Sequence, residues 1–127
     1  MDALIEAAIR ARENAHAPFS GFKVGAAVET DSGEIHAGCN VESVSYGLTM
    51  CAERVAVFKA ISAGARRFRR AAVATAAEKL TPPCGAGRQV LWELCGDIEL
   101  VLANAQGKTE SIRLKDLLPR PFDASTM

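Results

Sequence analysis

The sequence predicts an α/β fold in which helices cover a mixed β-sheet. Apolar residues recur at helical spacing in residues 3–14 and 51–65, whereas residues 69–77 form a short run of the buried-strand type, uncharged after its first two residues. The expected order of elements is α-β-β-α-β-α-β-β, and alternation of helices and strands in its middle is typical of a sheet with helices packed on it. The 127 residues, 49% of them hydrophobic, fit one compact domain spanning residues 1–127.

The first helix is expected over residues 3–14. Leu4, Ala7, Ala8 and Ala11 lie three and four positions apart and, with Ile9, form an apolar stripe. The following stretch "HAPFSG", residues 16–21, contains a proline and a glycine, which end helices.

A hairpin and a second helix are expected next. Residues 22–30 and 34–42 resemble two strands, because the Asp-Ser-Gly sequence between them has turn chemistry. The strongly apolar helix 51–65 should end near Gly64.

The second half of the chain alternates strands and helices. A strand is predicted over residues 69–77 and a helix over 83–94, opened at Pro83 and Cys84. Residues 97–108 predict a strand that enters a turn, followed by a short strand at 110–114 and a helical turn at 115–119.

The charge balance argues against a polyanionic partner. Fifteen basic and fifteen acidic residues give no net charge, so the whole molecule has no field that attracts nucleic acid or anionic membranes. The one basic cluster, "ARRFRR" at residues 65–70, could contact nucleic acid, but it also follows a helix C-terminus, where cations are favourable. We favour the second interpretation and expect a small neutral ligand.

A cytoplasmic location is expected from the N-terminus and the cysteines. The opening "MDALIEAAIRAREN" does not resemble a signal peptide, and no apolar run approaches the roughly 20 residues that span a bilayer. In a reducing compartment Cys39, Cys51, Cys84 and Cys95 should be free thiols or metal ligands.

Two short motifs, "CAE" at residues 51–53 and "PC" at residues 83–84, place thiols at the starts of predicted helices. The partial positive charge of a helix N-terminus lowers the pKa of a cysteine and favours the thiolate, the form that binds zinc. With Cys51 at the cap and Glu53 in the first turn, the carboxylate could take a proton from water on a metal and deliver it to a substrate. Zinc would assist by lowering the pKa of that water toward about 7.

The stretches "CNVESVSYGLTMCAERVAVFKAI" and "PPCGAGRQVL" resemble the cytidine deaminases, specifically the small homotetrameric zinc-dependent type. That pattern runs from an Asn-x-Glu strand through Cys-Ala-Glu-Arg to Pro-Cys-x-x-Cys-Arg-Gln, and "FSGFKVGAAVET" and "LLPRPF" also match it. The resemblance implies a three-layer α-β-α fold with a mixed five-stranded sheet. It also implies hydrolytic deamination of cytidine and 2′-deoxycytidine to uridine and 2′-deoxyuridine, as in pyrimidine salvage.

The resemblance assigns metal and proton chemistry residue by residue. Cys51 and Cys84 match zinc ligands, Glu53 matches the proton carrier, and Arg54 and Gln89 match groups that support the ligands. Either cysteine alone could be a buried apolar residue. The flanking Ala-Glu-Arg and Pro residues favour the ligand interpretation.

The resemblance also assigns the substrate contacts. Asn40 and Glu42 match the pair that hydrogen-bonds the ribose; two residues apart on a strand, they would face the same side. The remaining matches are Phe22 against the base, Ala52 in the substrate site, Tyr46 at a subunit contact near it, and Phe122 in a neighbouring subunit's pocket.

Gly87 departs from the pattern, because a second thiolate is expected three residues after Cys84. Cys95 cannot replace it, since on a continuous helix it lies roughly 16 Å farther along the axis. Three outcomes are open: zinc on two cysteines with an extra water, Glu53 drawn onto the metal with loss of the proton carrier, or an empty site. A Cys-to-Gly change in an otherwise intact deaminase would leave the same pattern.

Two other functions are compatible with these motifs. Gly87 could indicate a non-catalytic nucleoside-binding paralogue, which would bind nucleoside without metal. An enzyme of the same fold could instead act on a modified base or an aminonucleoside antibiotic, although Phe22, Asn40 and Glu42 favour an ordinary nucleoside.

Overall fold

The computed structural model describes residues 2–127 and contains a mixed five-stranded sheet in the order β2-β1-β3-β4-β5. The β3–β4 pair is parallel and the other neighbouring pairs are antiparallel. The strands are β1 (Gly25–Thr30), β2 (Ile35–Cys39), β3 (Phe68–Thr75), β4 (Glu99–Asn104) and β5 (Thr109–Arg113). The helices are α1 (Ala3–Arg12), α2 (Ala52–Ser62), α3 (Gly85–Cys95) and α4 (Leu114–Leu117), with 3-10 turns η1 (Tyr46–Leu48) and η2 (Ala124–Thr126).

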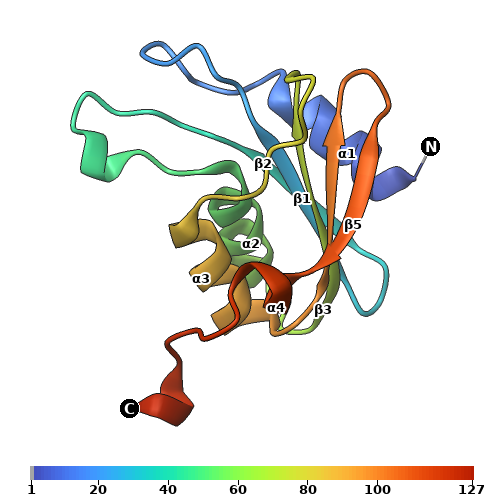
Figure 1. Cartoon of the computed structure of the whole chain (residues 1–127), viewed down its shortest axis with the longest axis vertical. Helices are drawn as coiled ribbons and strands as arrows, with labels where there is room; N and C mark the ends of the chain where they lie inside the picture. Colours follow the sequence, from blue (N-terminus) through green and yellow to red (C-terminus); the bar gives the residue numbers. More distant parts are fainter. Residues whose placement is uncertain (1) are drawn as a thin grey trace.

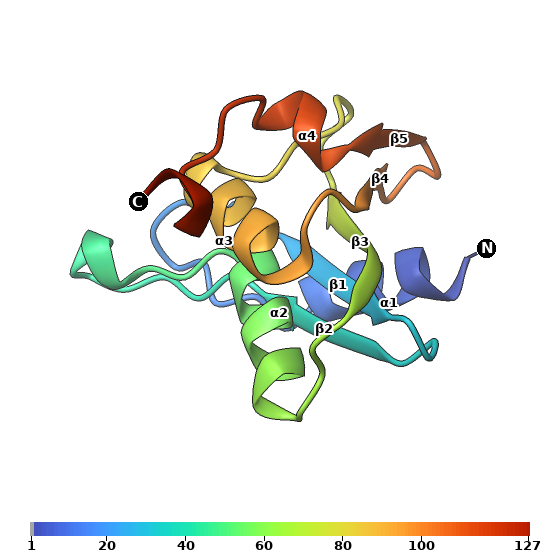
Figure 2. The same cartoon turned by 90° about the horizontal axis from the view of Figure 1, so that it is seen from below.

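The helices lie on both faces of the sheet. Helix α1 packs on one face, and α2 and α3 lie together on the other, as Figures 1 and 2 show. The predicted α/β fold with a mixed sheet covered by helices is therefore confirmed. Among residues 2–127 no helix combines the length and the apolar character that a membrane span requires.

Strand β3 shows why both faces need a cover. Its residues alternate between two buried clusters, so that Ala71 and Val73 pack on the side of α2 and α3, and Ala72 and Ala74 pack on the side of α1. A strand that is apolar on both faces reads as a continuous apolar run, which explains its sequence.

The first two strands form the predicted hairpin, but β2 is shorter than expected. The Asp-Ser-Gly turn is closed by a 2.9 Å hydrogen bond from Thr30 N–H to the Glu34 carbonyl, with Gly33 at φ 91°. Strand β2 ends at Cys39 and not at residue 42. Beyond it Val41 leaves the sheet and forms isolated bridges with His16 and Met50, which carries the chain toward α2.

Close packing at Gly38 places α2 on the sheet. A Cβ atom at this position would lie 2.7 Å from the backbone nitrogen of Ala56, so no side chain fits there. Helix α2 therefore lies directly against β2. Helix α3 follows the carboxyl end of β3, the edge of a parallel pair at which ligands usually bind.

The basic cluster 65–70 divides between a helix end and a strand. Arg66 donates to the Ile61 carbonyl at 2.9 Å, which is the predicted role of a cation at a helix C-terminus. Arg69 and Arg70 instead belong to β3 and both donate to the carboxylate of Glu29, at 2.9 and 2.7 Å. These two arginines are used within the fold, because the antiparallel pairing of β1 and β3 brings Glu29 opposite Arg70.

Candidate metal and substrate site

The two cysteines of the motifs lie at the N-caps of two helices. Cys51 is the N-cap of α2, with Glu53 in its first turn, and Cys84 is the N-cap of α3. The Cys84 sulfur accepts the backbone N–H of Gly87 at 3.4 Å. This is the arrangement that the sequence predicts for the two helix starts.

The two helix starts bring three possible ligands together. One ligand atom from each of Cys51, Glu53 and Cys84 lies within 4.8 Å of the others. The Cys84 sulfur is 3.6 Å from Oε1 of Glu53, and the Glu53 residue is only 2% exposed. Two sulfurs and a carboxylate oxygen are ligands that zinc accepts.

The Glu53 carboxylate occupies the space beside Gly87. A Cβ atom at position 87 would lie 2.0 Å from Oε1 of Glu53 and 2.6 Å from both Cδ and Cγ. No side chain could be attached there with Glu53 in this position. The space in which the family pattern expects a thiolate therefore contains the carboxylate.

Arg54 is the cation that contacts the cluster. Its Nε donates to the Cys51 sulfur at 2.9 Å and its Nη2 donates to the Thr49 carbonyl at 3.3 Å. Despite this hydrogen bond, burial and then the Glu53 carboxylate raise the pKa of Cys51 to about 12. The expected lowering by the helix N-terminus is outweighed, because a thiolate here would be buried beside a second negative charge.

The donor set fits a divalent cation. Two thiolates and a carboxylate carry three negative charges, and Arg54 balances one of them. A divalent ion neutralises the remaining two and keeps a coordinating thiol deprotonated. Zinc, with its preference for sulfur and oxygen in a small tetrahedral set, suits these residues.

A cavity of about 250 Å³ opens beside the cluster. Five of its lining residues were not identified from the sequence, because nothing in their local pattern separates them from ordinary core or loop positions; they are Val24, Thr49, Val73, Thr81 and Pro82. The predicted residues that line it are Phe22, Asn40, Cys51, Ala52, Glu53 and Cys84. A mostly apolar wall with a few polar groups is typical of a small-molecule site.

Asn40 and Glu42 do not line the same cavity. The Asn40 side chain accepts the Val24 N–H at 2.9 Å and donates to the Phe22 carbonyl at 2.8 Å, so it holds the segment that carries Phe22. Glu42 accepts the backbone N–H groups of Phe19 and Ser20 and lines a neighbouring cavity that also includes Tyr46. The two residues differ because β2 ends before them and the chain then bends toward Met50.

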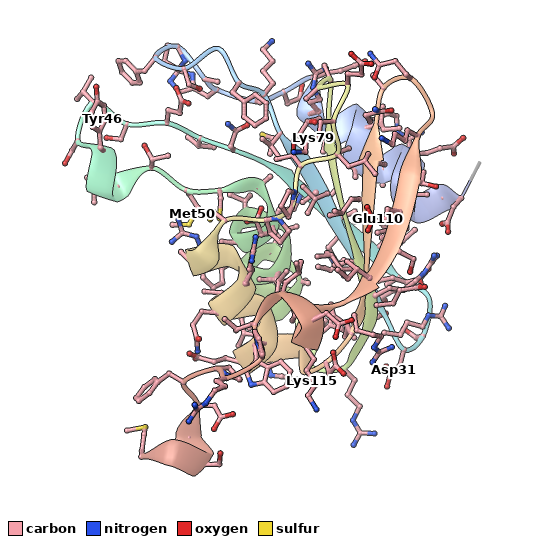
Figure 3. The ribbon with its side chains drawn as sticks, viewed as in Figure 1. Asp31, Tyr46, Met50, Lys79, Glu110 and Lys115 are labelled. Carbon is pink, nitrogen blue, oxygen red and sulfur yellow. The ribbon has the colours of Figure 1, made fainter. Side chains whose placement is uncertain are left out.

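Three other predicted residues lie away from the cluster within this chain. Tyr46 is 78% exposed near the tip of a projecting loop, distant in Figure 3 from Met50 near the start of α2. Phe122 is 64% exposed in the C-terminal segment and lines a separate hollow with Trp92. The Gln89 amide donates to Glu93 at 2.8 Å and to the Phe122 carbonyl, so these hydrogen bonds lie on the side of α3 that faces the C-terminal segment.

Comparison with known proteins identifies similar chains. The family described as "Cytidine and deoxycytidylate deaminase zinc-binding region" matches residues 1–103. The chain is 48% identical over 125 residues to a cytidine deaminase of Halalkalibacterium halodurans, with 98% of this chain and 95% of that protein covered. It is 44% identical over 123 residues to one of Sporosarcina psychrophila, covering 96% and 90%.

A solved structure gives the same similarity in three dimensions. The crystal structure of a cytidine deaminase from Burkholderia pseudomallei superposes with a TM-score of 0.89 and 52% sequence identity. The match covers 94% of this chain and 97% of that chain.

Proposed function

Because this chain belongs to the cytidine and deoxycytidylate deaminase family, we propose that it catalyses the zinc-dependent hydrolytic deamination of cytidine and 2′-deoxycytidine. The observation that carries the proposal is the grouping of Cys51, Glu53 and Cys84 at the edge of a mostly apolar cavity of about 250 Å³. The similarity of nearly the whole chain to cytidine deaminases supports the enzyme over a paralogue that only binds nucleoside.

In this proposal Cys51 and Cys84 hold the zinc ion, which when bound lowers the pKa of a water molecule toward about 7. Glu53 accepts a proton from the water that adds to C4 of the base and donates it to N3. It then assists transfer of a proton to the leaving amine, so that cytidine and water give uridine and ammonia. The burial of Glu53 excludes competing solvent from this transfer.

The cavity residues position the nucleoside. Phe22, 43% exposed at the cavity, offers an aromatic face to the base, and Ala52 leaves room beside Glu53. Asn40 fixes the Phe22 segment and still has one N–H and one lone pair for a ribose hydroxyl. Glu42 offers the ribose a further acceptor from the neighbouring cavity, and the Ser20 hydroxyl lowers the pKa of Glu42 and keeps this carboxylate ionised.

Arg54 supports the ligands in this proposal. Its hydrogen bond to the Cys51 sulfur spreads the negative charge of a thiolate and fixes the direction of that ligand. Gln89 has a different role, because its hydrogen bond joins α3 to the segment that carries Phe122.

We further propose a homotetramer that works in pyrimidine salvage in the cytoplasm. The exposed Tyr46 and Phe122 support the assembly, because aromatic side chains are enriched at interfaces between protein chains. Four free cysteines suit a reducing compartment. Light scattering on the purified protein should give four times the 13.5 kDa chain mass; a monomer at micromolar concentration would contradict the tetramer.

Loss of the ultraviolet absorbance of cytidine tests the activity directly. The full chain with added zinc should deaminate cytidine and 2′-deoxycytidine, and chelation of the metal should abolish turnover. Cys39→Ala is a matched control, because Cys39 lies at the end of β2 and outside the metal cluster. Zinc-loaded protein without turnover on either nucleoside would refute the proposal, and turnover on a modified nucleoside alone would redirect it.

A further inference from the structure

We propose that Glu53 is the third metal ligand in this chain and takes the place of the thiolate that position 87 lacks. The inference rests on the proposed function and adds to it a ligand set of two cysteines and one glutamate. One oxygen of the carboxylate would bind the metal and the other would remain to carry protons, so the proton carrier would be kept.

The absence of a side chain at Gly87 leaves space for the Glu53 carboxylate. Position 87 lies three residues beyond Cys84 on α3, so a side chain there would project on the same helix face as the Cys84 sulfur. Glu53 reaches into that space from α2, and three of its side-chain atoms lie within 2.6 Å of where a Cβ atom would be. Glycine is therefore the residue that permits this position of the carboxylate.

The distance between the Cys84 sulfur and the Glu53 carboxylate fits two ligands of one zinc ion. Zinc bonds of about 2.3 Å to sulfur and about 2.1 Å to oxygen, at a tetrahedral angle, separate the two ligand atoms by roughly 3.6 Å. In the structure the Cys84 sulfur lies 3.6 Å from Oε1 of Glu53. The pair is thus spaced as two ligands of one ion.

The burial and the charge of Glu53 also favour a cation beside its carboxylate. Glu53 is 2% exposed and accepts a hydrogen bond from the Cys84 thiol. The guanidinium of Arg54 is directed at the Cys51 sulfur and the Thr49 carbonyl. A buried carboxylate is costly unless a cation compensates it, and a divalent ion between the three residues would do so.

A side chain at position 87 would force Glu53 away. The clashing atoms are the end of a flexible side chain, so a change of Glu53 rotamer relieves the contact. Gly87→Cys would replace the carboxylate by a thiolate on the metal and leave both oxygens of Glu53 for proton transfer. Gly87→Ala would remove the carboxylate without replacing it.

The test is a set of zinc affinities, measured by competition with a chromophoric chelator on the full chain. Relative to the parent, Gly87→Ala and Glu53→Gln should each weaken zinc binding by at least on the order of 100-fold, since each removes a ligand. Gly87→Cys should bind zinc at least as tightly as the parent. Adding Glu53→Gln to Gly87→Cys should then change the affinity by less than about threefold, because Glu53 would no longer be a ligand.

Controls separate ligand loss from misfolding. Glu78→Ala removes an exposed glutamate outside the cluster and should leave the zinc affinity unchanged. Circular dichroism should give a parent-like helix content for all variants. Gly87→Ala should not lose helix, because alanine has a higher helix propensity than glycine. Parent-like zinc affinity in folded Gly87→Ala and in Glu53→Gln would overturn the inference while leaving the deaminase proposal intact. Failure of the parent and of Gly87→Cys both to bind zinc and to deaminate cytidine would instead refute the proposed function.

Discussion

Glu29 and Glu53 are both buried glutamates, 7% and 2% exposed, but their surroundings differ. The carboxylate of Glu29 accepts hydrogen bonds from Arg69 and from Arg70, and Arg70 also binds Asp2. Glu53 lies between two cysteines and accepts a 3.6 Å hydrogen bond from the Cys84 thiol.

This difference separates a structural carboxylate from a functional one. The charge of Glu29 is compensated within the fold, so that region needs no ligand. In residues 2–127 no arginine or lysine forms an ion pair with Glu53; Arg54 acts on it only at longer range, while its own hydrogen bond goes to the Cys51 sulfur. With both cysteines as thiolates, the cluster would lack two positive charges. Burial of a carboxylate does not by itself indicate a functional site, whereas burial of a carboxylate without an ion-pair partner does.

The largest expected difference between the two glutamates is in catalysis. Glu53→Gln should lower kcat for cytidine by about 10²–10⁴-fold, because general acid and base catalysis contributes factors of that size. Glu29→Gln should retain the parent kcat per folded molecule. Steady-state rates, corrected for the folded fraction by circular dichroism, give this comparison; equal losses in both variants would remove the distinction.

The next effect concerns stability at the Glu29 region. Arg70→Met should lower the free energy of unfolding by about 3 kcal/mol, because it leaves Glu29 and Asp2 without their shared partner. Urea denaturation at neutral pH measures the change. A loss below about 1 kcal/mol would show that Arg69 alone compensates Glu29.

The same region should control stability in acid. Hydrogen bonds from Arg70 lower the pKa values of both Asp2 and Glu29 below their ordinary values. The stabilisation is therefore complete above the ordinary carboxylate pKa of about 4 and is lost as the pH falls through the lowered values. Denaturation curves between about pH 6 and pH 2 should fall in the parent and be flatter in Arg70→Met.

The smallest effect is expected for the free energy of unfolding of Glu53→Gln, measured with a chelator present so that no metal is bound. Glu53→Gln removes a buried charge that has no ion-pair partner, so the free energy of unfolding should change by less than about 1 kcal/mol, toward greater stability. Glu29→Gln, which breaks hydrogen bonds to two arginines, is the matched comparison and should be clearly destabilised. Equal destabilisation of both variants would mean that Glu53 has a structural partner.

The local parts of this structure follow from the sequence. The apolar stripe of α1, the Asp-Ser-Gly hairpin turn and the position of Cys51 at the start of α2 were predicted, because each depends on neighbouring residues. The sheet order was not, because the placement of β1 between β2 and β3 depends on contacts distant in sequence.

The site was predictable as a set of residues but not as a geometry. The motifs indicated Cys51, Glu53 and Cys84, whereas the direction of the Glu53 side chain depends on the volume left free beside Gly87, on another helix. Similarly, Asn40 and Glu42 are two residues apart, but the end of β2 at Cys39 places them at different cavities.

The most direct measurement is a crystal structure of the full chain with bound zinc, with the ion located by its anomalous signal. We expect one zinc ion between Cys51, Cys84 and Glu53, with a carboxylate oxygen about 2.0–2.2 Å from the metal. Zinc held by the two cysteines with Glu53 turned away from it, or no zinc at these residues at saturating concentration, would contradict the account.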